Sequence, residues 1–105
     1  MEKIIFKEEI LEYFNDLVFT LFENDYFGFS DSAQNYVNKI VAFVISSISS
    51  FPHKKTPKSL QYLGSNYIFY KTNSRTTWYL FFEKSNQNYL ITGILNNYSE
   101  EAKEL

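Results

Sequence analysis

Three residues suited to phosphate chemistry are brought near one another by the expected strand order. Lys71 and Arg75 flank the turn between two predicted antiparallel strands, residues 67–71 and 76–83. The following strand runs back to the same end of the sheet and leads into Tyr98. Cations there would offset negative charge on a phosphate, while a Tyr can transfer a proton or stack on a base. The topology therefore predicts a polyanion site.

The arginine in this group is the only one in the chain. Its guanidinium is a rigid fork that stays charged, which is the geometry that phosphate recognition uses. The alternative interpretation is that Lys71 and Arg75 are ordinary polar turn residues and that Tyr98 packs at a strand end. Spacing alone leaves both interpretations open.

A second group of cations lies in residues 51–63, which we expect to form a loop because the segment contains two prolines. The group consists of Lys54, Lys55 and Lys58. His53 is expected to be a solvated loop residue rather than a catalytic one, although an ordinary His pKa suits proton transfer near neutrality. The sequence does not determine how this loop docks on the sheet.

Charge is unevenly distributed, although the net charge is only −2. Residues 1–31 carry eight acidic side chains, whereas residues 32–82 carry none and hold five lysines and Arg75. Acidic residues return from Glu83 to the end. The acid-free stretch favours an acidic partner. The alternative is that these strands and loops are simply filled with Ser, Asn and Tyr.

Most other kinds of site are excluded by composition. The chain has no cysteine and a single histidine, so it supports neither a thiolate metal site nor a His-based metal site or triad. It contains no phosphate-binding glycine loop, dinucleotide fingerprint or nucleophile elbow. The acids Glu8, Glu9 and Glu12 are expected to lie on a solvated helix face. We therefore expect no metal and no cofactor.

Periodicity predicts an α+β fold in one domain, residues 1–105. Apolar residues recur at helical spacing from about Glu8, and again after Asp31, the predicted N-cap of a second helix. Two helices joined by a short loop are expected to form an antiparallel hairpin. After Gly64 the period becomes two, which predicts an antiparallel meander of strands 67–71, 76–83 and 89–95.

Residues 4–6 would add a short N-terminal strand or lead into the first helix, so the meander sheet has three to four strands with the helices on one face. The middle strand is apolar on both faces and should be central and covered on both sides. Residues 96–105 are expected to be a polar, acidic tail. The longest apolar run, Ile40–Ile45, is too short to cross a membrane, and the N-terminus does not resemble a secretion signal. The expected location is therefore the cytoplasm.

The order of elements and several stretches resemble the RelE/ParE superfamily of bacterial toxins. The similarity is clearest from Lys54 to Tyr98. The stretch Leu60-Gln61-Tyr62-Leu63-Gly64 resembles the approach to the family's second strand, and Arg75-Thr76-Thr77-Trp78 begins a segment like its arginine-led third strand. Ile91-Thr92-Gly93-Ile94-Leu95-Asn96-Asn97-Tyr98 is similar to the last strand.

This resemblance implies the toxin of a type II toxin–antitoxin pair, neutralised by a cognate antitoxin protein. Ribosome-dependent members are endoribonucleases that cleave mRNA by attack of the ribose 2′-OH on the adjacent phosphate. By position, Arg75 would stabilise the transition state with help from Lys71, Tyr98 would transfer a proton or stack on a base, and the lysines of the loop would bind RNA phosphates. Alternatives are a non-catalytic ParE-like toxin and a protein-interaction module with no nuclease activity.

Overall fold

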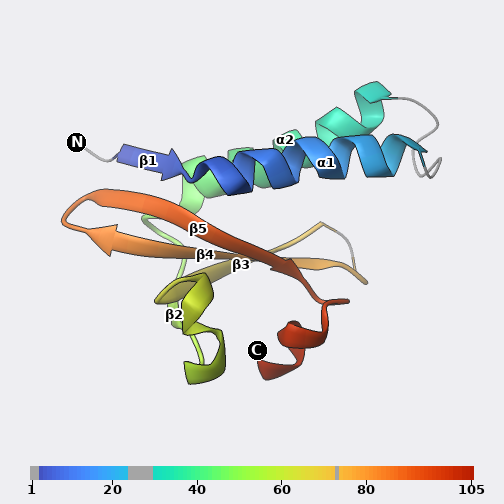
Figure 1. Cartoon of the computed structure of the whole chain (residues 1–105). Helices are drawn as coiled ribbons and strands as arrows, with labels where there is room; N and C mark the ends of the chain where they lie inside the picture. Colours follow the sequence, from blue (N-terminus) through green and yellow to red (C-terminus); the bar gives the residue numbers. More distant parts are fainter. Residues whose placement is uncertain (1–2, 24–29, 73) are drawn as a thin grey trace.

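The computed structural model describes residues 3–23, 30–72 and 74–105, and within them two α-helices cover one face of a β-sheet (Figure 1). The elements in chain order are β1 (Lys3–Phe6), α1 (Glu8–Glu23), α2 (Ser30–Ser47), β2 (Lys54–Lys55), the 3-10 helix η1 (Lys58–Leu63), β3 (Asn66–Lys71), β4 (Thr77–Ser85), β5 (Asn88–Asn96) and the 3-10 helix η2 (Glu100–Glu104). The predicted α+β class is confirmed.

The described strands form one sheet in the order β1-β5-β4-β3-β2, with β4 at its centre as predicted. β3, β4 and β5 are antiparallel neighbours, β2 pairs antiparallel with β3, and β1 runs parallel to β5. The prediction of a three- to four-stranded antiparallel sheet is therefore wrong, because five described strands make a mixed sheet. The two residues of β2 are too few to produce a visible period, and the pairing of β1 joins distant parts of the chain.

The hydrophobic core lies between the helices and the sheet. Its fully or nearly fully buried residues include Ile10 and Phe14 of α1, Val37, Ile40, Val44 and Ile48 of α2, and Ile68, Leu80 and Phe82 of the sheet. Leu11 and Ile45, expected on the buried stripes, are 49% and 55% exposed, because the sheet covers a narrower strip of each helix than the apolar pattern suggests. α2 begins at Ser30, one residue before the predicted N-cap.

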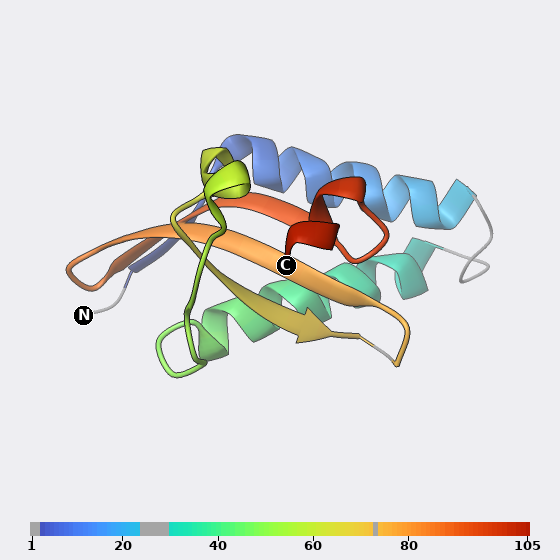
Figure 2. The same cartoon turned by 90° about the horizontal axis from the view of Figure 1, so that it is seen from below.

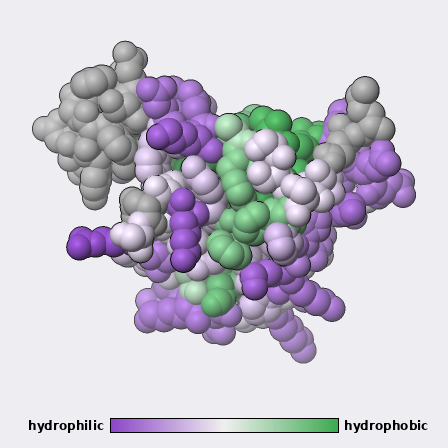
Figure 3. All heavy atoms as spheres, turned by 180° about the vertical axis from the view of Figure 1, so that it is seen from behind, coloured by the Kyte–Doolittle hydropathy of each residue, from purple (hydrophilic) through white to green (hydrophobic). Residues whose placement is uncertain are grey.

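On the β3 side of the molecule, aromatic rings connect the helix layer with the sheet. Phe43 of α2 stacks on Tyr70 of β3 at 4.7 Å, and Phe51 contacts both Phe43 and Phe69. The space-filling view of this side shows an apolar band bordered by hydrophilic residues (Figure 3). This ring cluster therefore continues the core around the β3 side of the sheet.

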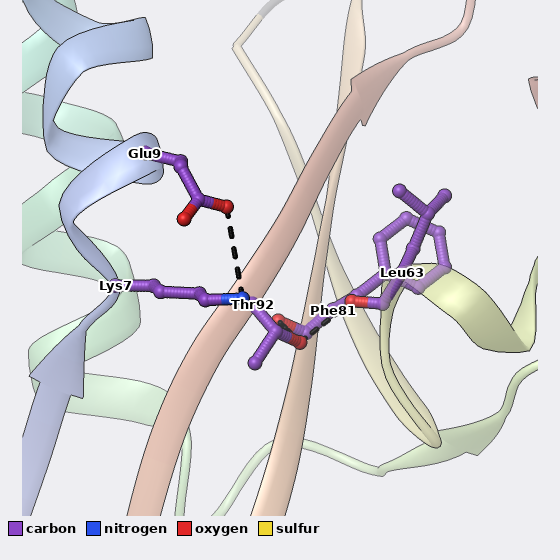
Figure 4. A network of polar contacts seen from close by, with 5 residues as sticks. All are labelled: Lys7, Glu9, Leu63, Phe81 and Thr92. Atoms are coloured by element: carbon purple, nitrogen blue, oxygen red, sulfur yellow. Dashed lines mark hydrogen bonds and ion pairs between the residues drawn. The ribbon is translucent and has the colours of Figure 1, made fainter.

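The face opposite the α-helices, called here the second face, carries the odd-numbered residues of β3 and the first half of β4. η1 docks on it at a β-bulge, where a register shift after Phe81 leaves Thr92 as the extra residue. The Thr92 hydroxyl donates a hydrogen bond to the carbonyl oxygen of Leu63 at 2.6 Å (Figure 4). A Cβ at Gly93 would lie 2.7 Å from the same oxygen, so glycine is what permits the contact. Phe81 is fully buried beneath η1 and its surroundings, so β4 is covered on both faces there.

Two segments expected to be irregular have regular structure. Residues 51–63 contain β2 and η1 rather than a loop throughout. The acidic tail contains η2, which lies over the second face near β4 and β5 (Figure 2). In the part of the chain that the structure describes, no helix has both the length and the apolar character to cross a bilayer.

Candidate functional site

The end of the sheet formed by the β3–β4 turn is tied to the residues that follow β5. The side-chain amide of Asn97 donates to the main-chain oxygen of Arg75 at 2.9 Å, and its Oδ1 accepts from the amide of Thr77. The hydroxyl of Tyr98 donates to the same Arg75 oxygen at 2.9 Å. The structure therefore brings Arg75 and Tyr98 together, as the antiparallel strand order predicted. The contact is made by the main-chain oxygen of Arg75.

The Tyr98 hydroxyl, a candidate for proton transfer, also stabilises the β3–β4 turn. Its hydroxyl proton is committed to the Arg75 carbonyl, while the residue as a whole is 68% exposed. An exposed ring whose orientation is fixed by a hydrogen bond of its hydroxyl is a suitable surface for stacking of a nucleobase. Proton transfer by Tyr98 would first require this hydrogen bond to break.

Replacing Tyr98 by Phe removes one exposed hydrogen bond and keeps the ring. We expect the free energy of unfolding to fall by about 0.5–1 kcal/mol, the lower range for a neutral hydrogen bond, with the fold retained. Urea unfolding followed by circular dichroism measures this change. Tyr62→Phe is the matched control, because Tyr62 is 72% exposed and has no hydrogen bond within the described residues. Equal stability of the two variants would contradict a stabilising hydrogen bond from Tyr98 to the Arg75 carbonyl.

Lys71 lies in a pocket of about 210 Å³ on the second face. The pocket is lined by Lys54, Tyr67, Phe69, Lys71, Thr77, Tyr79 and Leu105. Strand register explains the grouping: Lys71 pairs with Thr77, Phe69 with Tyr79, and Lys54 with Tyr67, and alternate residues of a strand share a face. The ammonium of Lys54 lies 5.9 Å from the centre of the Phe69 ring.

The pocket combines positive charge, hydroxyl groups and aromatic rings. Lys54 and Lys71 are the charged side chains of its lining. The Tyr67 hydroxyl is protonated at neutral pH and can donate a hydrogen bond, and burial, with a smaller effect of the nearby Tyr79, raises its pKa further above the ordinary value. Such a lining can hold an anionic group beside a planar ring.

The other predicted residues lie outside this pocket. Lys55 follows Lys54 on β2 and is exposed, and alternation along the strand directs it to the opposite face. Lys58 is exposed at the start of η1. Arg75 lies in the adjacent turn with Tyr98. The six candidates thus divide into a pocket pair, Lys54 and Lys71, a turn pair, Arg75 and Tyr98, and two lysines apart from both.

His53 is an exposed residue of the irregular segment between α2 and β2, as expected from sequence, but its ring also packs against the sheet. Its ring lies edge-on to Phe82 at 4.9 Å and near Tyr89, and Nε2 hydrogen-bonds the carbonyl oxygen of Ile48 at the end of α2. The histidine is therefore an anchor for the chain between α2 and β2, on the side of the sheet that faces the helices.

Several pocket residues were not among the sequence candidates. Three of them could have been found from the sequence. Tyr67 and Phe69 alternate with Lys71 along one strand and therefore share its face, and Tyr79 lies opposite Phe69 in the hairpin. Leu105, which also lines the pocket, could not have been found in this way, since its position depends on how η2 folds back.

Comparisons with protein-family models, curated proteins and solved structures found no match to this chain.

Proposed function

We propose that this chain is a RelE/ParE-like toxin that binds RNA on the second face and acts as a ribosome-dependent mRNA endonuclease, neutralised by a cognate antitoxin. The pocket that holds Lys54 and Lys71 between aromatic rings supports this proposal. Its volume of about 210 Å³ is below the range of about 300–1,000 Å³ typical of small-molecule sites. A lining of this size and charge suits one phosphate or base of a longer chain better than a whole metabolite.

The proposed reaction is attack of a ribose 2′-OH on the adjacent phosphorus, which expels the 5′-oxygen of the next nucleotide and leaves a cyclic phosphate. Lys71 and Arg75, at neighbouring positions around the hairpin end, would offset the charge that develops on the phosphate oxygens. One proton must leave the 2′-oxygen and one must reach the leaving oxygen.

The kinds of proton carrier at the site explain why such an enzyme would need the ribosome. His53, with its contacts to Ile48 and Phe82, is turned away from the second face. The described residues of the pocket and turn offer Lys and Tyr side chains for proton transfer rather than an imidazole or a carboxylate side chain. Most of the rate would then come from holding the RNA in an attacking geometry, which the ribosome supplies.

A second candidate, a non-catalytic toxin or protein-binding module, is favoured by the outer side of α1. Leu11 and Phe19 are 49% and 61% exposed and lie two helical turns apart, beside the acidic residues Glu12 and Asp16. Exposed apolar side chains beside acidic ones fit a protein partner better than they fit RNA. This candidate predicts toxicity without RNA cleavage.

Induced expression, with growth and mRNA integrity followed together, tests the two candidates. Under the endonuclease proposal, Arg75→Ala removes growth arrest and lowers ribosome-dependent cleavage by roughly 100-fold or more, the effect of losing a transition-state cation. The main-chain oxygen that accepts from Asn97 and Tyr98 is retained in this variant. Lys39→Ala, which alters an exposed cation of α2, is the control and should stay toxic. Arrest without cleavage would favour the second candidate, and no arrest by the natural chain would contradict both.

A further inference from the structure

The single tryptophan of the chain, Trp78, is held between the two α-helices. It is 3% exposed, and two tyrosine rings lie edge-on to it: Tyr13 of α1 at 6.4 Å and Tyr36 of α2 at 6.5 Å. The two contacts are nearly identical in geometry. They differ in one respect, because the indole Nε1 donates a hydrogen bond of 2.9 Å to the hydroxyl of Tyr36.

The hydroxyl of Tyr36 continues this bond to the β3–β4 turn. It lies 3.0 Å from Oγ1 of Thr72, which in turn donates to the carbonyl oxygen of Thr76 at 3.5 Å. The amide of Thr72 also donates to that carbonyl at 3.1 Å. Either hydroxyl can be the donor of the bond between Tyr36 and Thr72. A chain of hydrogen bonds therefore runs from Trp78 through Tyr36 and Thr72 to Thr76.

Thr72 and Thr76 close the turn that carries the predicted cations. Lys71 directly precedes Thr72, and Arg75 directly precedes Thr76. Asn97 and Tyr98 hold the Arg75 carbonyl from the end of β5, whereas Tyr36 holds Thr72 from the helix layer. The turn is thus anchored from two sides. The hydrogen bonds of Tyr36 on the helix side are partly buried, and a hydrogen bond is stronger there than in water. Loss of the Tyr36 hydroxyl would also leave the indole N–H of Trp78 without its acceptor.

We propose that Tyr36 is a positioning residue for anion binding at this edge: its hydroxyl couples α2 to the β3–β4 turn and so fixes Lys71 and Arg75 relative to the second face. Tyr36 itself touches no substrate. The effect on RNA rests on the proposed function, whereas the ordering of the turn does not.

Tyr36→Phe tests this role because it keeps the ring against Trp78 and removes only the hydroxyl. Tyr13→Phe is the matched control, since that hydroxyl has no hydrogen bond within the described residues. The readouts are exchange of the Thr72 amide by NMR, exchange of the Trp78 indole proton, and affinity for a short single-stranded RNA measured by fluorescence anisotropy. We expect Tyr36→Phe to speed both exchange rates by about 2- to 10-fold, the range for one lost hydrogen bond, and to weaken RNA binding by a similar factor. Tyr13→Phe should match the natural protein.

Thr72→Val provides a second route to the same answer, because it breaks the chain beyond Tyr36 and leaves the Trp78 bond in place. It should speed exchange of the amide at position 72 and weaken RNA binding while the indole proton keeps its natural exchange rate. Natural exchange rates in the turn of Tyr36→Phe would overturn the positioning role, as would a loosened turn that binds RNA normally. Failure of the natural protein to bind RNA would count against the proposed function instead, and the exchange measurements would still decide whether Tyr36 orders the turn.

Discussion

Gly93→Ala is expected to lower the free energy of unfolding by about 3 kcal/mol, near the upper end of the usual cost of overpacking. The added Cβ would lie 2.7 Å from the carbonyl oxygen of Leu63 and 2.9 Å from its Cβ. Both atoms belong to the main chain or are attached directly to it, so a side-chain rotation cannot relieve the clash. η1 must move away from β5, and the Thr92 hydroxyl then loses its acceptor.

Urea unfolding of Gly93→Ala beside Asn88→Ala measures this effect. Asn88 opens the same strand and is exposed, so its replacement should change stability by less than about 0.5 kcal/mol. Gly64→Ala should resemble Gly93→Ala. Gly64 has a φ of 153°, and an added Cβ would lie 2.8 Å from the amide nitrogen of Phe82. Natural stability in the Gly93 variant would mean that η1 does not dock as described.

The double replacement of Lys54 and Lys71 by Ala is expected to weaken binding of single-stranded RNA by roughly 10- to 100-fold, since each ordinary phosphate contact accounts for about 1 kcal/mol and binding is strongly electrostatic. The slope of log affinity against log salt should fall by about 1.4, or about 0.7 for each lost phosphate contact. Both residues are exposed, so the fold should survive. Fluorescence anisotropy with a labelled oligonucleotide over a series of salt concentrations gives both quantities.

Lys55→Ala is the sharpest control for this experiment. Lys55 is adjacent to Lys54 in the sequence and has the same charge, but the alternation of β2 places it away from the pocket. It should therefore lose little affinity. A loss at Lys55 equal to that of the double variant would show that net charge, rather than the pocket, governs binding.

The parts of the fold that follow from local pattern were predictable. The middle strand is apolar on both faces, which predicted its central position in the sheet. What failed depends on contacts between distant segments. Neither the parallel pairing of β1 nor the short β2 has a local signature, and the bulge at Thr92 changes the parity of β5, so that Ile91 and Ile94 share the helix-facing core.

The candidate site was predictable to a similar degree. Counting antiparallel strands places Tyr98 beside Arg75, which hydrogen bonding in the structure bears out. The same parity could have grouped Lys71 with Phe69 and Tyr67 on one face. The position of Lys54 could not be deduced, because it depends on how the segment after α2 is anchored by His53 and paired with β3.

The parallel pairing of β1 with β5 also bears on the order of events during synthesis. Lys3 pairs with Asn88, so the first strand emerges from the ribosome long before its partner exists. Until β5 follows, β1 has no neighbour in the sheet, and the contacts between α1 and β5 cannot form. Such late, long-range closure slows folding and prolongs the exposure of apolar surface in the nascent chain.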